Sequence, residues 1–527
     1  MPAVSFDPRP EGAATPSADG VRQRRERALA ALRAAMSDAD VAGAERCADR
    51  LRASLPHQRR LADNTVLVAY GGGKDSSFTL AFVRAMQLIL YARHGDTFGL
   101  RTVTNRQAGM PQAVLDNIDR AYRALDIPGD PDCETLLVDG DEVRPFRRDA
   151  PTPAAVVERH RLDLLMTGHR TFAEARPTFC NSCNLSMVNG FGVAAAYGRP
   201  VDVIVTGDSP DEQRAYQLWI NRLARRFGAG AGRPGRRRPG ETGFRGFLKA
   251  TNDIAHAYYA DLYGAQAHRE IAERRVSHDV PHQLRFFSIF DDTRYSSRNH
   301  WRLLTEHLGF EFDEIAFSFT ESDCGNPTLM AHLRGLKCER RYGRDYAEGL
   351  REYLTFAESL MRRKEFPDEL IDRVRRRYAG ADAVAHMRSL ANRFAWDAYG
   401  LTEEQLVCMV YSPVTDKGER LELYLDREQP RLAGRVAEVH ALLAGDDEPE
   451  TGEARQLAAA LRACSGLDLQ RLRTLYRSPA VGTPGLSTLD GRKDLLSAVL
   501  AGDPHKQVIE TRHAPDGPVV RELLSGR

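Results

Sequence analysis

The most informative chemical motif in the sequence is VLVAYGGGKDSS, residues 66–77. An apolar run typical of a buried strand leads into three glycines (71–73), then into Lys74, Asp75 and an apolar stretch that favours a helix. Glycines let the backbone approach a polyanion with its amides directed at it, and the following helix N-terminus adds partial positive charge. The pattern predicts a cradle for nucleotide phosphates, without the Walker spacing GxxxxGK[ST] or the dinucleotide spacing GxGxxG. A capped turn between a strand and a helix is the alternative interpretation.

This segment resembles the PP-loop, SGGxDS, of N-type ATP pyrophosphatases. Gly72, Gly73, Asp75 and Ser76 match that motif, whereas Gly71 replaces its leading serine. The resemblance implies a parallel α/β domain of the adenine-nucleotide α-hydrolase type, with ATP as a substrate. It also implies that ATP is cleaved between its α- and β-phosphates, that AMP is transferred to a carbonyl or carboxylate oxygen, and that a nitrogen or sulfur nucleophile displaces the AMP.

A second segment, GDSPDE (207–212), is similar to the GHNxDD motif that many PP-loop proteins carry at a strand end. Gly207 and Asp211 match, Glu212 is a chemically similar substitute, and Asp208 replaces histidine. A capped helix start explains the same residues equally well, so both interpretations stay open.

The resemblance implies a role for each matched residue. Lys74 would neutralise phosphate charge, and Asp75 would bind Mg²⁺ directly or through water. The expected catalytic residues are Lys74, Asp75 and Asp211. The expected nucleotide-binding residues are Gly71, Gly72, Gly73, Lys74, Asp75, Ser76, Ser77, Gly207 and Asp208.

Three cysteines form a candidate metal site. Cys180 and Cys183 form a CxxC in FCNSCN, placed between a loop and a helix, and Cys324 in ESDCGNP is the best third ligand. Zinc and iron–sulfur clusters both take such thiolate sets with a further ligand, for which Cys338, Cys133 and His169 are candidates. A redox or persulfide-carrying dithiol and purely structural thiols are the alternatives.

The segment around the CxxC bears on the transferred group. CNSC, AAAYGRPVD and VIVTGDSPDEQ resemble the matching stretch of bacterial N-acetyl sugar amidotransferases of surface-polysaccharide synthesis. That resemblance implies nitrogen transfer to a small-molecule substrate, with ammonia from a glutaminase subunit or from solution. The three-cysteine set instead resembles the cluster-bearing tRNA thiolation branch, so sulfur transfer to a tRNA base or a small molecule is the second hypothesis. A non-enzymatic nucleotide-binding protein is the third, since Gly71 and Asp208 depart from the motifs.

These motifs need a sheet to position them. Between Thr65 and Thr206, short apolar runs alternate with helical patterns, which predicts an α/β fold with a parallel sheet covered on both faces. Ligands of such sheets lie beyond the carboxyl ends of the strands. The expected strands are 66–70, 98–104, 134–138, 162–167 and 201–206, and the expected helices are 78–91, 110–125, 154–161 and 185–197.

The chain divides by composition into five parts. We expect a disordered tail with a helical extension (1–60), the PP-loop domain (61–225) and a Gly/Pro/Arg-rich loop (226–246), either a solvated linker or an anion clamp. An α/β and helical substrate region (247–398), with strands at 284–290 and 315–320 and a helix at 298–308, precedes a mostly helical C-terminal domain (399–527).

Overall composition limits the partners. The chain has 527 residues, with 74 Lys and Arg against 73 Asp and Glu, so its formal net charge is +1. This balance disfavours tRNA as a partner, although it leaves room for a local basic patch. Eight irregularly spaced cysteines and no apolar run of about 18 residues predict a cytoplasmic protein with no membrane partner.

Overall fold

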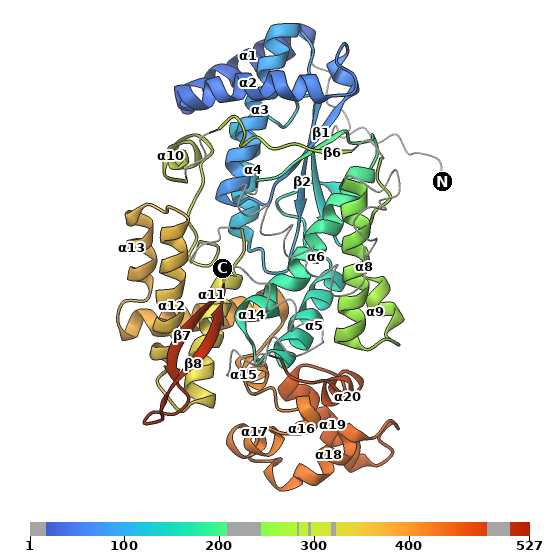
Figure 1. The fold of residues 1–527 in the computed structure, drawn as a ribbon, viewed down its shortest axis with the longest axis vertical. Coiled ribbons are helices and arrows are strands. Elements are labelled where there is room, and N and C mark those ends of the chain that lie inside the picture. Colours follow the sequence, from blue (N-terminus) through green and yellow to red (C-terminus); the bar gives the residue numbers. More distant parts are fainter. Residues whose placement is uncertain are drawn as a thin grey trace, which may run out of the picture.

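A computed structural model of the chain describes residues 17–207, 244–281, 284–293, 297–317, 323–481 and 506–526. The described chain is α/β, with a six-stranded, mostly parallel sheet and many helices (Figure 1). No helix in these ranges is long and apolar enough to span a lipid bilayer.

The strand order of the sheet is β4-β3-β2-β1-β5-β6, which is compatible with a Rossmann-like fold. Neighbouring strands are parallel except β3 and β4, which are antiparallel. The predicted parallel α/β class is therefore confirmed at this coarse level. The strands are β1 (Thr65–Ala69), β2 (Gly99–Asn105), β3 (Cys133–Asp139), β4 (Glu142–Pro145), β5 (Val203–Val205) and β6 (Arg285–Phe286).

Helices cover both faces of the sheet. Val66, Val68 and Tyr70 belong to one core, whose helices are α1 (Ala18–Ala35), α2 (Asp38–Ser54), α3 (Lys74–His94) and α4 (Gln112–Ala124). Leu67 belongs to the other core, whose first helices are α5 (Ala154–Arg170), α6 (Ala175–Ala196) and α8 (Phe244–Tyr263). Because successive side chains of a strand point to opposite faces, a strand covered on both faces is apolar on both, as residues 66–69 of β1 are.

The rest of the described chain is largely helical and extends beyond the carboxyl edge of the sheet (Figure 1). A two-stranded antiparallel hairpin of β7 (Lys506–Arg512) and β8 (Val519–Ser525) packs against these helices. The helices are α9 (His268–Ala272), α10 (Ser297–Arg302), α11 (Asn326–Leu336), α12 (Tyr346–Arg363), α13 (Asp368–Arg377), α14 (Ala381–Tyr399), α15 (Glu403–Tyr411), α16 (Thr415–Gly418), α17 (Leu421–Glu428), α18 (Val436–Ala444), α19 (Gly452–Ser465) and α20 (Leu469–Arg477), with short 3-10 or π turns at Leu61–Asp63, Leu303–His307, Lys337–Arg341 and Ala433–Arg435.

Several predicted elements were wrong. The expected strand at 162–167 lies inside α5, because a short apolar run buried on all sides has the same pattern in a strand and in a helix. The expected strand at 284–290 shrinks to the two residues of β6. Residues 314–317 form a turn, and residues 318–320, the rest of the strand expected at 315–320, lie outside the described ranges.

Two predicted boundaries also change. The expected Gly/Pro/Arg-rich loop lies mostly outside the described residues, but its last residues, 244–246, belong to α8. The expected C-terminal domain contains the β7–β8 hairpin in addition to helices. The expected tail lies outside the described ranges up to residue 16, and α1 and α2 confirm the helical extension.

Candidate functional site

The three-glycine loop lies at the carboxyl end of β1, a central strand of the sheet. Gly72 has a φ of +80°, a left-handed conformation that favours glycine, and Gly73 is the N-cap of α3. No side chain caps the first turn of α3. The first-turn amides, which have no partner within a helix, and the helix dipole therefore make this loop suitable for binding an anion.

Two close contacts set the position of the loop. A Cβ atom on Gly72 would lie 2.7 Å from Cγ1 of Ile118 and 2.9 Å from Cγ1 of Val114, both on α4. A Cβ atom on Gly207, just after β5, would lie 2.9 Å from the backbone nitrogen of Ser76. The structure thus brings Gly207 against the loop, where the sequence predicts a second nucleotide-binding segment.

Lys74 and Asp75 form an ion pair at the start of α3. Nζ of Lys74 lies 2.6 Å from Oδ1 of Asp75, and their side chains are 6% and 29% exposed. The same ammonium lies 5.2 Å from the ring centroid of Phe366, a cation–π distance. The positive charge is therefore held in a nearly dry place beside the loop, where its effect on an anion is strong.

The two serines after Asp75 lie in different surroundings. Oγ of Ser76 donates to the carbonyl of Gly73 at 3.1 Å, so this hydroxyl stays beside the loop. Ser77 is buried, and its hydroxyl lies 3.3 Å from that of Tyr70. Ser76 is therefore the serine that the loop geometry favours as a phosphate contact.

His300 lies against the first turns of α3 and was not predicted. Its ring stacks on Phe78, with 3.6 Å between ring centroids. Burial and the charge of Lys74 lower its pKa to about 4, against the opposing effect of Asp40. His300 is therefore neutral near pH 7 and adds no competing positive charge.

The segment Asp323–Asn326 connects the loop to the cysteines. A Cβ atom on Gly71 would lie 3.6 Å from Oδ2 of Asp323, so this carboxylate lies over the first glycine. Gly325 donates its amide to the carbonyl of Gly109, which follows β2, at 2.9 Å. Cys324 is thereby held at the carboxyl edge of the sheet, next to the three-glycine loop.

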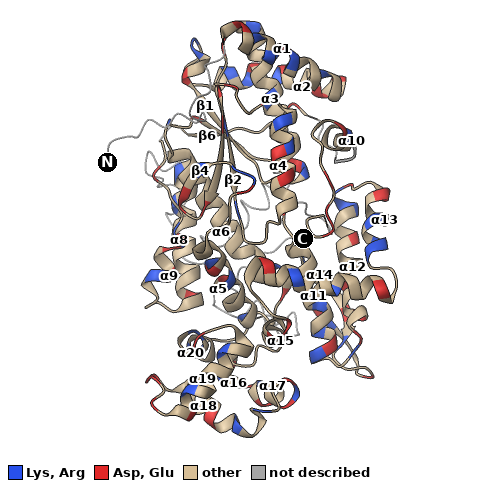
Figure 2. Cartoon of the chain, turned by 180° about the vertical axis from the view of Figure 1, so that it is seen from behind, with Lys and Arg blue, Asp and Glu red and all other residues tan. Residues whose placement is uncertain are grey.

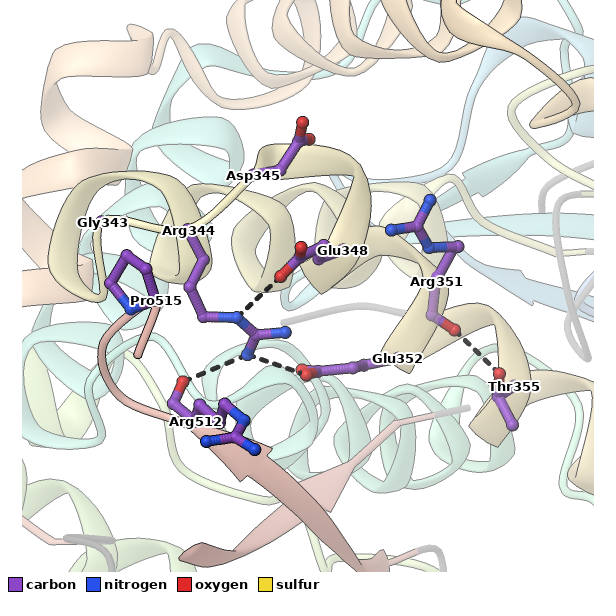
Figure 3. Close-up of a pocket in the computed structure, with 9 residues that line it drawn as sticks. All are labelled: Gly343, Arg344, Asp345, Glu348, Arg351, Glu352, Thr355, Arg512 and Pro515. Carbon is purple, nitrogen blue, oxygen red and sulfur yellow. Dashed lines mark hydrogen bonds and ion pairs between the residues drawn. The ribbon is translucent and has the colours of Figure 1, made fainter. Parts of the chain in front are cut away.

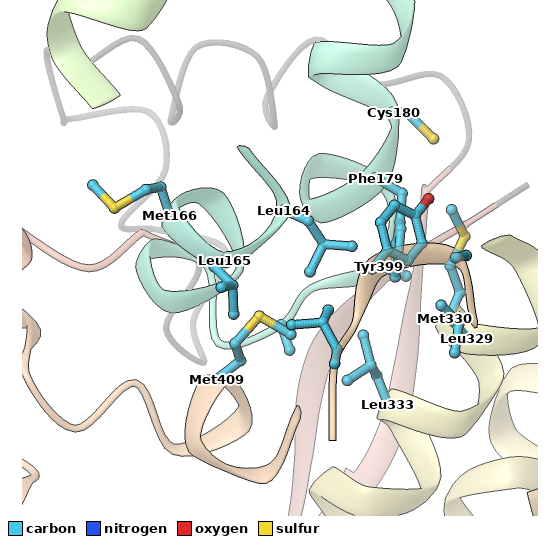
Figure 4. Packing of buried hydrophobic residues seen from close by; sticks show 14 of the residues in the cluster. Leu164, Leu165, Met166, Phe179, Cys180, Leu329, Met330, Leu333, Tyr399 and Met409 are labelled. Carbon is cyan, nitrogen blue, oxygen red and sulfur yellow. The ribbon is translucent and has the colours of Figure 1, made fainter. Parts of the chain in front are cut away.

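The CxxC lies on α6, wholly within the helix rather than at the predicted junction with a loop. Cys180 is buried and Cys183 is half-buried. Both are close enough to Tyr399 to act on it electrostatically, as is Cys324. Figure 4 shows the hydroxyl end of Tyr399 directed toward the turn that carries Cys180. The structure therefore gathers the three predicted cysteines around one phenol.

The three thiols have the chemistry that zinc or an iron–sulfur cluster requires. Across the described ranges, however, no three His, Cys, Asp or Glu side chains lie close enough together to hold a metal ion. The three cysteines therefore stay a predicted metal site, and we derive no step through a metal.

The other suggested ligands lie apart from the CxxC. Cys133 starts β3 at the amino end of the sheet, where Nη1 of Arg84 lies 3.3 Å from its sulfur. Cys338 lies 3.8 Å from a carboxylate oxygen of Glu352 on α12. His169 is buried near the end of α5, and burial lowers its pKa to about 4.

A separate hollow of about 650 Å³ lies between α12 and the β7–β8 hairpin (Figure 3). Arg344 occupies its centre and is bound by Glu348, by Glu352 and by the carbonyl of Arg512. The lining contains as many carboxylates as guanidinium groups, so it offers no excess charge to a nucleotide. The face seen in Figure 2 likewise mixes Lys and Arg with Asp and Glu.

Asp208, Asp211 and Glu212 lie outside the described residues, so their predicted roles stay predictions. The site also contains residues that sequence reasoning missed. Asp323 and Asn326 flank a cysteine that was singled out, and their position after a predicted strand was a usable signal. Phe366, His300 and Tyr399 come from helical regions with no motif around them.

Comparison with known proteins assigns this chain to no family. A scan against protein-family models and a search of curated proteins both found no match to this chain.

Proposed function

We propose that this chain is an N-type ATP pyrophosphatase that transfers AMP from ATP to an oxygen of a small molecule and then lets nitrogen displace the AMP. One observation carries the proposal. The three-glycine loop lies at the carboxyl end of a central parallel strand, opens an uncapped helix and packs against Gly207. That is where open α/β sheets bind ligands, and its amides suit a polyphosphate.

In this proposal, different groups of the site bind the triphosphate and the metal ion. The loop amides and Lys74 hold the charge that develops on the departing pyrophosphate. Lys74 is ion-paired with Asp75, so a bound polyphosphate would compete with this carboxylate for the ammonium group. Asp75 and Asp323 are hard oxygen donors beside the loop and would hold Mg²⁺, which would supply positive charge to the polyphosphate.

The nucleophile that displaces AMP is either a nitrogen or a sulfur species. The resemblance around the CxxC favours ammonia, supplied by a glutaminase partner or from solution. Sulfur transfer is the second candidate, because Cys180, Cys183 and Cys324 all lie around Tyr399 beside the loop. In that case one thiol would take a sulfane sulfur from a persulfide donor, and a second thiol would reduce the resulting persulfide, leaving a disulfide. The sulfide released would displace AMP from the adenylated tRNA base or small molecule.

The test of the loop is Asp75→Asn with Asp382→Asn as the matched control. Asp382 is an exposed aspartate in the first turn of α14, far along the chain from the loop. We expect Asp75→Asn to lower acceptor-dependent pyrophosphate release from ATP by about 100-fold or more, the usual effect of removing one preorganised charge. The control should retain normal turnover. Equal turnover in both variants would refute the phosphate-loop assignment.

The two nucleophiles are separated by Cys180→Ala. Pyrophosphate release is measured with candidate acceptors and either ammonium or, in single turnover, a persulfide donor. Nitrogen transfer predicts ammonium-dependent product in the wild type and in the variant. Sulfur transfer through the thiols predicts a product that requires the persulfide donor and is lost in the variant. ATP binding with no pyrophosphate under any condition would support the non-enzymatic alternative.

A further inference from the structure

Helix α14 clamps the segment that carries Cys324. A Cβ atom on Gly325 would lie 2.4 Å from Cζ of Phe394, so this ring presses on the residue after Cys324. Tyr399, five residues further along the same helix, donates its hydroxyl to Oδ1 of Asn326 at 2.7 Å. Two side chains of one helix therefore hold the two residues that follow Cys324.

Gly109 makes room for this contact. A Cβ atom there would lie 2.4 Å from Oδ1 of Asn326 and 2.5 Å from the hydroxyl of Tyr399. The loop after β2, the start of α11 and the end of α14 thus meet at one point. The hydrogen bond from the amide of Gly325 to the carbonyl of Gly109 joins two of these segments directly.

The phenol of Tyr399 also faces the thiols. Its hydroxyl end points toward the turn of α6 that carries Cys180 (Figure 4). Burial raises the pKa of Tyr399 well above its ordinary value, and thiolates at Cys324, Cys183 and Cys180 raise it further. The phenol therefore keeps its proton near pH 7 and donates it to Asn326.

We propose that Tyr399 is a positioning residue that acts through Asn326 to keep Cys324 together with Cys180 and Cys183, and Asp323 over the phosphate loop. The position of Cys324 stands on the contacts above. The consequence for the nucleotide rests on the proposed function, because Asp323 lies over Gly71. The helical region after residue 323 thereby becomes part of the site.

The first test compares Tyr399→Phe with Tyr411→Phe in the full chain. Tyr411 is an equally buried tyrosine whose hydroxyl donates to the carbonyl of Arg340 and to Glu428. Alkylation of each cysteine by iodoacetamide is followed by peptide mass spectrometry. We expect Tyr399→Phe to speed alkylation of Cys324 about five-fold, the effect of one lost hydrogen bond, with no such change in the control. An unchanged rate at Cys324 would overturn the proposal.

The pattern across the cysteines distinguishes positioning from general loosening. Loosening alone would also speed alkylation of Cys47, which is buried in the other core. Positioning predicts a faster rate at Cys324 and an unchanged rate at Cys47. An equal rise at both would assign Tyr399 a purely structural role and overturn the proposal.

Asn326→Ala provides an independent variant if Tyr399→Phe folds poorly. It removes the acceptor and leaves the ring in place, so it should speed alkylation of Cys324 to a similar extent. The double variant should be no faster than either single one, because both remove the same contact. Additive effects would show that the two side chains act separately and would overturn the proposal.

Adding a non-hydrolysable ATP analogue with Mg²⁺ separates this proposal from the proposed function. In the wild type we expect the analogue to slow alkylation of Cys324, and in Tyr399→Phe we expect that protection to be lost. A wild-type rate that the analogue does not change would count against nucleotide binding at the loop. The comparison without nucleotide would still decide the role of Tyr399.

Discussion

Adjacent glycines of the three-glycine loop differ in whether the surrounding structure has room for a side chain. Gly71 has room for a side chain, since the nearest side-chain atom to an added Cβ is 3.6 Å away. Gly72 has none, because its φ is +80° and Ile118 and Val114 back it at less than van der Waals distance. The serine that stands at the position of Gly71 in the PP-loop motif is therefore sterically acceptable here, and this departure from the motif leaves the loop intact.

The same substitution at the two positions tests this difference. We expect Gly71→Ser to retain stability within about 0.5 kcal/mol and to turn over ATP at least as well as the wild type. Gly72→Ser should lose about 1–3 kcal/mol from strain and overpacking, and most of its turnover. Thermal unfolding and pyrophosphate release measure both. Equal loss in the two variants would mean that the loop has a different conformation.

At the scale of elements, the β7–β8 hairpin is joined to the helices by buried charges. Glu522 on β8 lies 2.9 Å from Nη1 of Arg334 and 3.8 Å from Nζ of Lys337. Ser525, at the end of β8, donates its amide and its hydroxyl to the carboxylate of Glu174, each at 2.8 Å. Glu174 is the N-cap residue of α6, the helix that carries the CxxC. The hairpin therefore helps to position the start of α6.

Glu522→Gln should release the hairpin. The variant leaves buried cations without one of their counter-charges, which costs about 3 kcal/mol and corresponds to roughly 100-fold faster hydrogen exchange in β7 and β8. Glu510→Gln, an exposed glutamate on β7, is the matched control and should exchange as the wild type does. Similar exchange in all three proteins would contradict the structural role of the charge.

The same contact makes the hairpin sensitive to acid. Burial by itself raises the pKa of Glu522, but Arg334, His513 and Lys337 outweigh it and hold the pKa below its usual range. The charged form therefore stabilises the docked hairpin above the unfolded-state pKa of about 4.3, and this contribution is lost as pH falls through the lower folded-state pKa. Exchange corrected for its intrinsic rate should speed up in acid in the wild type, and less in Glu522→Gln.

The elements that the sequence predicts best are those with long, unambiguous patterns. Helices at 78–91 and 110–125 and strands at 98–104 and 134–138 are confirmed within a few residues. The run at 162–167 failed because burial on all sides removes the periodicity that separates strand from helix. The hairpin was missed although Asp516 and Gly517 form the dipeptide that favours tight turns, because its strands do not alternate cleanly.

At the scale of the whole molecule, the candidate site is assembled from parts that are distant in sequence. The three-glycine loop contributes Gly71–Ser76, and the segment that lies against it contributes Asp323–Asn326. Helix α14 contributes Tyr399. Local patterns identify the loop and the cysteines because each is a motif within a few residues. They cannot identify Phe366 or Tyr399, whose roles depend only on how the helices after residue 323 pack against the carboxyl edge of the sheet.

This arrangement predicts which segments should exchange their amide hydrogens more slowly when a nucleotide binds. We expect a non-hydrolysable ATP analogue with Mg²⁺ to slow hydrogen exchange in three separate places, residues 70–78, 323–336 and 362–367, because Asp323 lies over Gly71 and Phe366 lies over Lys74. Helix α18, which packs against α17, α19 and α20, is the internal control and should not change. Protection confined to 70–78 would leave the later helices outside the site. Protection centred on α17 and α18 would place the nucleotide elsewhere and refute the assembly argued from these contacts.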